Sequence, residues 1–206
     1  MTQELIVRII GMILVPFTVV VCFIPFVKKI AFQINAVDTP RGGRHIHKKI
    51  TPKLGGLAIF IGFLLGYMIF GTHSVLMNAV LIGSFIIILT GVIDDITELT
   101  ALQQFIGQVA AAAVLVFYGG LSINELTAFG FRIDFGIISP FVTMFFIVGC
   151  INCINLIDGL DGLSGGISSI YFLTTGIIAV IQQKSGLDFI ISFIMLGSTL
   201  GFLIYN

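Results

Sequence analysis

Long apolar runs constrain the fold of this chain more than any other feature. Windows of about 18 or more apolar residues recur along its 206 residues, and a helix of that length crosses the hydrocarbon core of a bilayer. Hydrophobic residues make up 57% of the sequence and charged residues 10%, with a mean hydropathy of +1.15. This composition excludes a soluble globular domain. The formal net charge of zero gives no global field that would recruit nucleic acid.

The runs predict an all-α, polytopic membrane protein with about seven transmembrane helices, forming a single integral membrane domain over residues 1–206. The first run, Leu5 to Val27, is too long for a cleaved signal peptide and ends at Lys28-Lys29, as a stop-transfer segment does. Residues 119–136 contain short alternating stretches that could form a β-hairpin. The predicted spans are 5–27, 54–71, 75–93, 101–118, 137–155, 163–182 and 187–205.

The basic residues predict how these spans are oriented. Loop 28–53 holds seven of the ten Lys and Arg residues of the chain, and the positive-inside rule places such a loop in the cytoplasm and the N-terminus outside. Because alternate spans end at the same face, the third and fifth spans then also end in the cytoplasm. The motif-bearing loops are therefore expected to be cytoplasmic.

Acidic residues gather where the third and fifth spans end. Asp94 and Asp95 close the stretch "GVIDD", and "NLIDGLDGLSGG" (155–166) places Asp158 and Asp161 between glycines. Carboxylates in so apolar a chain cost free energy unless a partner compensates them. Magnesium typically takes one or two protein carboxylates together with substrate phosphates. With the basic loop expected at the same face, these acids predict a Mg²⁺–pyrophosphate site.

Structural interpretations of the same residues remain open. The Asp94-Asp95 pair could be a solvated helix end, and Asn152 and Asn155 could form interhelical hydrogen bonds. Gly159 and Gly162 indicate that the helix ends near Asp158, whereas the glycines of this stretch could also serve close helix packing.

The cysteines and the basic loop indicate less about function than the acidic residues do. Cys22, Cys150 and Cys153 lie inside apolar runs and are expected to be small core residues, because no redox or zinc context surrounds them. The charge of the loop that contains "DTPRGGRHIHKKITPKLGG" (38–56) could be a topology signal or a contact with anionic lipids.

Together, "GVIDD", "NLIDGLDGLSGG" and "DTPRGGRHIHKKITPKLGG" resemble motifs of the polyprenyl-phosphate N-acetylhexosamine-1-phosphate transferases. The resemblance extends from Asp38 to Asn206. "PKLGG" and "NLIDGLDG" look more like the undecaprenyl-phosphate GlcNAc-1-phosphate transferase branch than like the related phospho-MurNAc-pentapeptide transferases.

The resemblance implies transfer of a sugar-1-phosphate, GlcNAc-1-phosphate in this branch, from a UDP-sugar to undecaprenyl phosphate, with release of UMP. It implies Mg²⁺ as the cofactor, with Mn²⁺ as an alternative, and the bacterial plasma membrane as the location. The reaction would be the first membrane step of cell-envelope polysaccharide or teichoic acid synthesis. A homodimer is compatible with the resemblance, and nucleic acid is not an expected partner.

Site residues are carried over only where the motifs match. Asp94 and Asp95 match the catalytic pair, and Asp94, Asp95 and Asp158 are the implied metal ligands. The implied substrate-binding residues are Asn155, Asp158, Asp161, His47, Lys48, Lys49 and Arg44.

The sequence departs from the family pattern in two places. Gln104 stands where the family has a lysine shortly after the Asp-Asp pair. The chain ends at "LGFLIYN", before the segment that supplies the family's next metal ligand. It thus resembles the N-terminal two-thirds of such an enzyme, truncated at its C-terminal end. The alternatives are a catalytically inactive fragment and, in another class, a small transporter, although the acids lie at span ends and no internal repeat supports transport.

Overall fold

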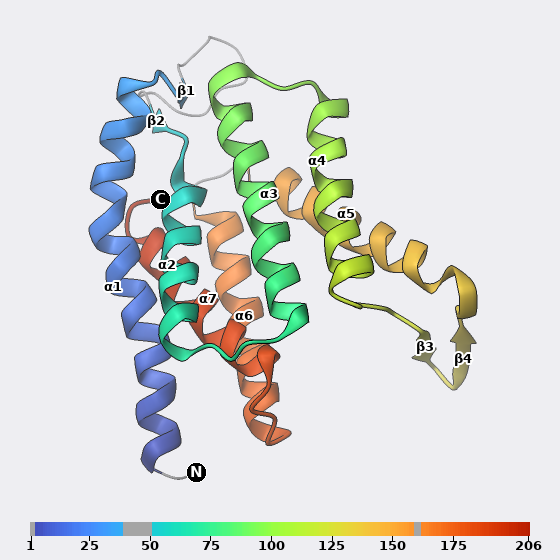
Figure 1. Ribbon diagram of the computed structural model, residues 1–206. Coiled ribbons are helices and arrows are strands. Elements are labelled where there is room, and N and C mark those ends of the chain that lie inside the picture. The colour runs from blue at the N-terminus through green and yellow to red at the C-terminus, as the bar shows by residue number, and fades with distance from the viewer. Residues whose placement is uncertain (1–2, 39–50, 159–161) are drawn as a thin grey trace. The chain divides into compact units, whose positions relative to one another are not determined.

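The computed structural model describes residues 3–38, 51–158 and 162–206. Within these residues α-helices dominate, and two short antiparallel strand pairs accompany them (Figure 1). A π-helical turn, Val114–Tyr118, continues α4, and a 3-10 turn, Gly136–Ile138, precedes α5. The helices are α1 (Gln3–Gln33), α2 (Gly55–Phe70), α3 (Val75–Thr97), α4 (Ala101–Ala113), α5 (Ser139–Ile157), α6 (Leu163–Ile181) and α7 (Leu187–Leu203). The strands are β1 (Val37–Asp38), β2 (Thr51–Pro52), β3 (Glu125–Ala128) and β4 (Phe131–Asp134).

Every predicted span corresponds to a helix, and the expectation of an all-α polytopic membrane protein is confirmed. Within the part of the chain that the structure describes, five helical segments are long and apolar enough to cross a membrane: α1, α3, α4 with its π-helical turn, α5 with its 3-10 turn, and α6. The α2 and α7 helices are shorter apolar helices. The largest difference lies in α1, which continues past Lys28-Lys29 to Gln33. Lysine is a good helix former, so a stop-transfer flank ends the apolar run without ending the helix.

The described chain falls into two compact units. The first comprises Met1–Thr72, Gly91–Glu98 and Leu160–Asn206, and the second comprises His73–Thr90 and Leu99–Gly159. The α3 helix therefore contributes its first part to the second unit and its last residues, which include Asp94 and Asp95, to the first unit. The prediction of one integral membrane domain over 1–206 stays a prediction.

Close glycine contacts hold the first unit together. In this unit α7 packs against α1, α2 and α6, and α1 packs against α2. Gly197 and Gly201 of α7 press directly on the α1 backbone, and a Cβ at Gly201 would lie 2.8 Å from the carbonyl oxygen of Phe17. On α2, a Cβ at Gly62 would lie 2.5 Å from Val20. The Cβ position of Gly66, also on α2, lies 2.7 Å from Pro16 Cγ. Both α7 and α2 thus present two glycines four residues apart to α1, the spacing that allows membrane helices to approach closely.

The second unit combines the first part of α3, α4, α5 and the β3–β4 hairpin. A Cβ at Gly107 of α4 would lie 2.5 Å from Thr90 Oγ1 of α3, so these two helices are in close contact. The hairpin that the alternating pattern allowed is present, with Leu126 paired to Ile133 and Ala128 to Phe131.

The expectation that the cysteines are core residues is wrong. Cys22, Cys150 and Cys153 are all free and exposed on the surfaces of α1 and α5. In a membrane protein the surface that faces lipid is as apolar as the core, so an apolar neighbourhood in the sequence does not predict burial.

Candidate functional site

Asp94 and Asp95 lie in the last turn and a half of α3, and both are partly buried. The helix ends at Thr97, and Glu98 follows it in the left-handed region with a φ of 50°. Two residues before Asp94, Val92 packs against a cluster of buried residues of the same unit, which includes Ile24 of α1 and Leu54, the residue just before α2. This contact fixes the end of α3 that carries the acidic pair.

The turn that follows the acidic pair is short and well capped. Thr100 caps α4 reciprocally with Gln103: the Gln103 amide donates to Thr100 Oγ1 at 3.4 Å, and the Thr100 amide donates to Gln103 Oε1 at 2.9 Å. This capping box satisfies amide groups that the first turn of a helix otherwise leaves without partners. The α4 helix therefore begins at a defined point just after Asp94 and Asp95.

On α5, the polar residues occupy the C-terminal end. Asp158 is the C-cap residue, its amide donates to the Ile154 carbonyl at 3.1 Å, and both Asp158 and Asn155 are exposed. The helix therefore ends where the glycines predicted. Asn152 instead donates through Nδ2 to Gln108 Oε1 of α4 at 2.7 Å, so the interhelical interpretation is confirmed for this asparagine.

The three predicted site acids that the structure describes, Asp94, Asp95 and Asp158, stand at helix C-terminal ends, where the last carbonyl groups already carry a partial negative charge. An anionic side chain is disfavoured there, whereas a cation bound between the carboxylate and the helix end is favoured. Helix stability therefore does not explain why the sequence keeps aspartates at these positions. Each of these two helix ends, taken by itself, would favour a bound cation.

The remaining predicted site residues fall outside the described part of the chain: Arg44, His47, Lys48, Lys49 and Asp161. Just after Asp161, α6 begins at Leu163 with Gly162 in a left-handed conformation (φ 72°) and with no side-chain cap. Gly165 contacts Leu203 closely, its Cβ position lying 3.0 Å from Leu203 Cδ2, so the packing interpretation is confirmed for that glycine.

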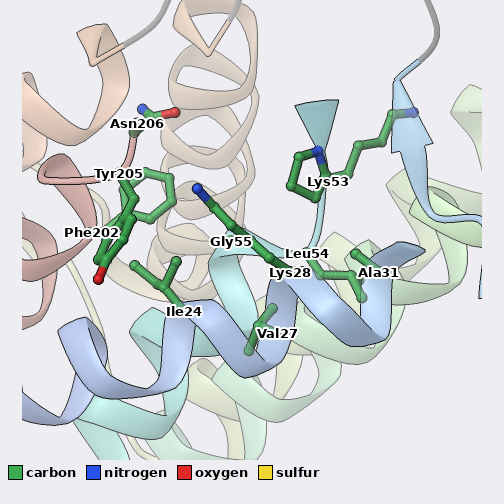
Figure 2. A pocket seen from close by; sticks show the side chains of 11 residues that line it. Ile24, Val27, Lys28, Ala31, Lys53, Leu54, Gly55, Phe202, Tyr205 and Asn206 are labelled. Atoms are coloured by element: carbon green, nitrogen blue, oxygen red, sulfur yellow. The ribbon is translucent and has the colours of Figure 1, made fainter. Parts of the chain in front are cut away.

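A pocket of about 90 Å³ in the first unit is lined by two lysines that were not among the predicted site residues, although one of them, Lys53, lies in the 38–56 motif. Figure 2 shows Lys28 and Lys53 at this pocket, with the Lys28 side chain directed toward Tyr205 and the Lys53 side chain directed away from it. The pocket walls include Ile24, Leu54 and Phe202. The Lys28 ammonium lies 4.9 Å from the centre of the Tyr205 ring, a distance typical of a cation–π contact. Among the described lining residues the charged side chains are the two lysines, so the side-chain charge of this pocket favours an anion.

Tyr205 forms a hydrogen bond to a backbone carbonyl of α1 that has no helical donor. Pro25 has no N–H, so it leaves the carbonyl of Val21, four residues earlier, without its helical donor. The Tyr205 hydroxyl donates to that carbonyl oxygen at 3.3 Å. Because Val21 and Tyr205 are 184 positions apart, no local pattern could have predicted this contact.

The donor chemistry of the acidic ends fits a hard divalent cation. Asp94 and Asp95 near the end of α3, and Asn155 and Asp158 at the end of α5, offer carboxylate and amide oxygens, the ligand type that Mg²⁺ and Mn²⁺ prefer. Among the described residues no group of three or more His, Cys, Asp or Glu forms a complete metal cage. Magnesium does not require one, because it commonly uses one or two carboxylates and keeps water and phosphate ligands.

Comparison with known proteins places the chain in a family. The sequence profile of glycosyl transferase family 4 matches residues 77–206, which include both acidic helix ends. The chain belongs to this family. The resemblance carried by its three motifs is thereby confirmed, and members of the family depend in general on a divalent metal.

Individual relatives agree with this assignment. The chain is 40% identical over its whole length to a probable undecaprenyl-phosphate N-acetylglucosaminyl 1-phosphate transferase of Bacillus subtilis, covering 58% of that protein. It is 32% identical over 88% of its length to a decaprenyl-phosphate N-acetylglucosaminephosphotransferase of Mycolicibacterium smegmatis, covering 49% of it. A phospho-N-acetylmuramoyl-pentapeptide-transferase of Listeria monocytogenes is 32% identical over 89% of the chain, which covers 61% of it. The chain thus spans about half to three-fifths of the length of these relatives.

Proposed function

We propose that this protein transfers GlcNAc-1-phosphate from a UDP-sugar to undecaprenyl phosphate and releases UMP. The observation that carries the proposal is the placement of Asp94, Asp95 and Asp158 at helix ends that disfavour anions, in a chain that belongs to glycosyl transferase family 4. The branch is supported by the 40% identity to the Bacillus subtilis relative over the whole chain.

In the proposed reaction an oxygen of the lipid phosphate attacks the phosphorus that is bonded to the sugar. A new P–O–P linkage forms between lipid and sugar phosphates, and the bond to the UMP oxygen breaks, so that UMP leaves with the bonding electron pair. Phosphoryl transfer of this kind depends mainly on positioning and charge stabilisation. The residues of the chain therefore need to hold two anionic substrates together in line.

Asp94 and Asp95 would hold Mg²⁺ in this scheme, and one of them would accept the proton of the lipid phosphate. Bound Mg²⁺ neutralises negative charge on the pyrophosphate oxygens during transfer. Asp158 and Asn155 would bind the nucleotide side of the donor. The amide groups in the uncapped first turn of α6 could donate to phosphate oxygens, as helix N-termini commonly do.

The lysine pocket adds a place for the acceptor. Lys28 and Lys53 belong to the same unit as Asp94 and Asp95 and stand beside an apolar wall. Ammonium groups next to apolar side chains suit a phosphate whose lipid chain enters the bilayer. Arg44, His47, Lys48, Lys49 and Asp161 stay predicted phosphate and nucleotide contacts.

A transfer assay with two donors tests the proposal. Purified protein, undecaprenyl phosphate and Mg²⁺ are incubated with either UDP-GlcNAc or UDP-MurNAc-pentapeptide labelled in the sugar, and label in lipid and free UMP are followed. We expect label from UDP-GlcNAc, loss of transfer with EDTA, and recovery with Mg²⁺ or Mn²⁺. Label only from the muramoyl donor would refute the branch. Absence of transfer from both donors would contradict the activity and favour an inactive fragment.

The proposed location, membrane orientation and oligomeric state depend on the same proposal. A location in the bacterial plasma membrane with the acidic helix ends in the cytoplasm follows from the basic loop and from the need for a cytoplasmic nucleotide sugar. A homodimer stays a prediction, which the molar mass of the detergent-solubilised protein would test.

A further inference from the structure

The β3–β4 hairpin is amphipathic, and its apolar face has no cover among the described residues. Its register pairs Leu126 with Ile133 and Ala128 with Phe131. Because side chains alternate between the two faces of a strand pair, these four apolar residues share one face. All eight residues of the two strands are exposed, and Phe131 retains 76% of its surface.

The opposite face of the hairpin is polar. It carries Glu125, Thr127, Arg132 and Asp134, and Arg132 forms an ion pair with Glu125 across the strands. Charged side chains and apolar side chains are therefore segregated completely between the two faces. Such segregation is typical of an element that lies at a boundary between water and an apolar phase.

The tip of the hairpin places an aromatic side chain where the backbone disfavours it. Phe129 and Gly130 form the two-residue turn, with φ angles of 50° and 83°. Turns with two positive φ angles favour Asn-Gly or Asp-Gly, because bulky side chains are strained there. Phe129 is nevertheless fully exposed, at 100% of its surface. The fold of the hairpin therefore does not explain a phenylalanine at this position, which indicates that Phe129 interacts with something outside the hairpin.

The membrane is the apolar phase within reach of this face. The hairpin lies between two segments long and apolar enough to cross a bilayer, Ala101–Tyr118 and Gly136–Ile157 (Figure 1). Its base is fixed to α5, because Thr143 Oγ1 accepts from the Ile123 amide at 2.8 Å and Ser139 donates to the Ile123 carbonyl at 2.7 Å. The hairpin is thus fixed within a few residues of the membrane surface.

Exposed apolar side chains also follow the hairpin, in the 3-10 turn and in α5. Ile137 and Phe141 stand four residues apart and expose 92% and 69% of their surfaces, and Phe145 extends the same stripe. On a membrane-spanning helix an exposed apolar stripe is suited to contact lipid. The apolar face of the hairpin is a second exposed apolar surface, and only Phe135 and Gly136 separate β4 from Ile137 in the sequence.

From these observations we propose that the β3–β4 hairpin binds the bilayer surface, with Leu126, Phe129, Phe131 and Ile133 in the interfacial layer and the Glu125–Arg132 face in water. Two-stranded hairpins have open edges whose N–H and C=O groups need water or headgroups, so this one lies at the interface and not in the hydrocarbon core. By the predicted orientation it binds the leaflet opposite the basic loop. The occupant of the apolar face is lipid, independently of the catalytic assignment.

Single-tryptophan fluorescence tests this proposal, because the 206-residue chain has no tryptophan. Phe129→Trp and Phe131→Trp report on the apolar face, and Thr127→Trp is the matched control on the polar face of the same hairpin. Each variant is reconstituted in phosphatidylcholine–phosphatidylglycerol vesicles, with or without brominated acyl chains. Far-UV circular dichroism confirms that each variant keeps its helical content.

The expected result is a clear separation between the two faces. The indole at position 129 or 131 should emit at shorter wavelength than the indole at position 127, lose most of its fluorescence in brominated lipid, and resist aqueous iodide. The indole at position 127 should be quenched by iodide and not by brominated lipid. Iodide quenching at all three positions would place the hairpin in water and overturn the proposal. Shielding of positions 129 and 131 from both quenchers would overturn it in favour of a covering protein segment or a second copy.

Discussion

Asn152 on α5 donates through Nδ2 to Gln108 Oε1 on α4 at 2.7 Å, and it also donates to the Val148 carbonyl at 2.9 Å. Gln108 is buried, with 7% of its surface exposed. This contact ties the C-terminal half of α5 to α4 two turns before Asp158. It therefore fixes the helix whose end carries Asn155 and Asp158.

Removing the interhelical contact should destabilise the second unit without reaching the reacting groups. Asn152→Ala should lower the free energy of unfolding by about 1 kcal/mol, because Gln108 is left buried without this partner. Gln108→Ala should cost a similar amount, and the double variant less than the sum of the two. The unfolding free energy of the wild type, the two single variants and the double variant is measured by titrating the purified proteins in mixed micelles with a denaturing detergent. Full additivity in this cycle would contradict a direct Asn152–Gln108 contact.

The close contact between α7 and α1 should not tolerate a side chain. Gly197→Val places a Cβ against the Ile13 carbonyl, so the helices must separate, at a cost of about 3 kcal/mol or more. Gly149→Val on α5 is the matched control, because no atom lies within 4 Å of its Cβ position. Thermal unfolding in detergent, followed by loss of the monodisperse peak in size-exclusion chromatography, compares the two. Equal melting temperatures for the two variants would refute the assigned packing.

Tyr205 should stabilise α1 through the carbonyl that Pro25 leaves without a donor. Tyr205→Phe keeps the ring below Lys28 and removes the hydroxyl, so we expect a loss of about 0.5–1 kcal/mol in unfolding free energy. Pro25→Ala restores an N–H for the Val21 carbonyl, and in that background Tyr205→Phe should cost almost nothing. A cost that is unchanged by Pro25→Ala would show that the hydroxyl acts elsewhere.

The lysine pocket should affect the lipid acceptor and not the nucleotide donor. The double substitution Lys28→Gln, Lys53→Gln should raise the KM for undecaprenyl phosphate on the order of tenfold, because exposed charge contacts are each worth about 1 kcal/mol or less. The KM for the UDP-sugar should change by less than about twofold, because the two lysines are proposed to contact the lipid phosphate and not the donor. Lys184→Gln, at the end of α6 beyond Ile181, is the control. Equal increases in both KM values would exclude a specific role in acceptor binding.

Much of the fold could be predicted because bilayer thickness sets the length of each apolar run. The α2, α3, α6 and α7 helices lie where the runs lie, and the end of α5 at Ile157 follows from Gly159 and Gly162. The four-residue spacing of Gly197 and Gly201 is typical of close helix packing, but the spacing does not identify α1 as the partner helix. Cysteine burial could not be predicted, because lipid-facing and core positions are equally apolar.

The candidate site was predictable only in part. Motifs identified Asp94, Asp95, Asn155 and Asp158, whose placement at helix ends the structure describes. Lys28, Lys53 and Tyr205 were missed as a group because they meet only through the packing of α1 and α7 and the approach of the chain to α2. No periodic pattern in a single sequence relates residues that far apart.

Substitution of the acids tests the central claim most directly. Asp94→Asn, Asp95→Asn and Asp158→Asn are compared with Asp188→Asn, an acid in the first turn of α7 where helix stability alone explains it. Label from UDP-GlcNAc in lipid is measured at equal amounts of folded, membrane-inserted protein. We expect each of the three site variants to lose transfer by about 100-fold or more, and Asp188→Asn to retain it. Near-normal transfer by all three site variants would contradict the assignment of these helix ends as the reacting site.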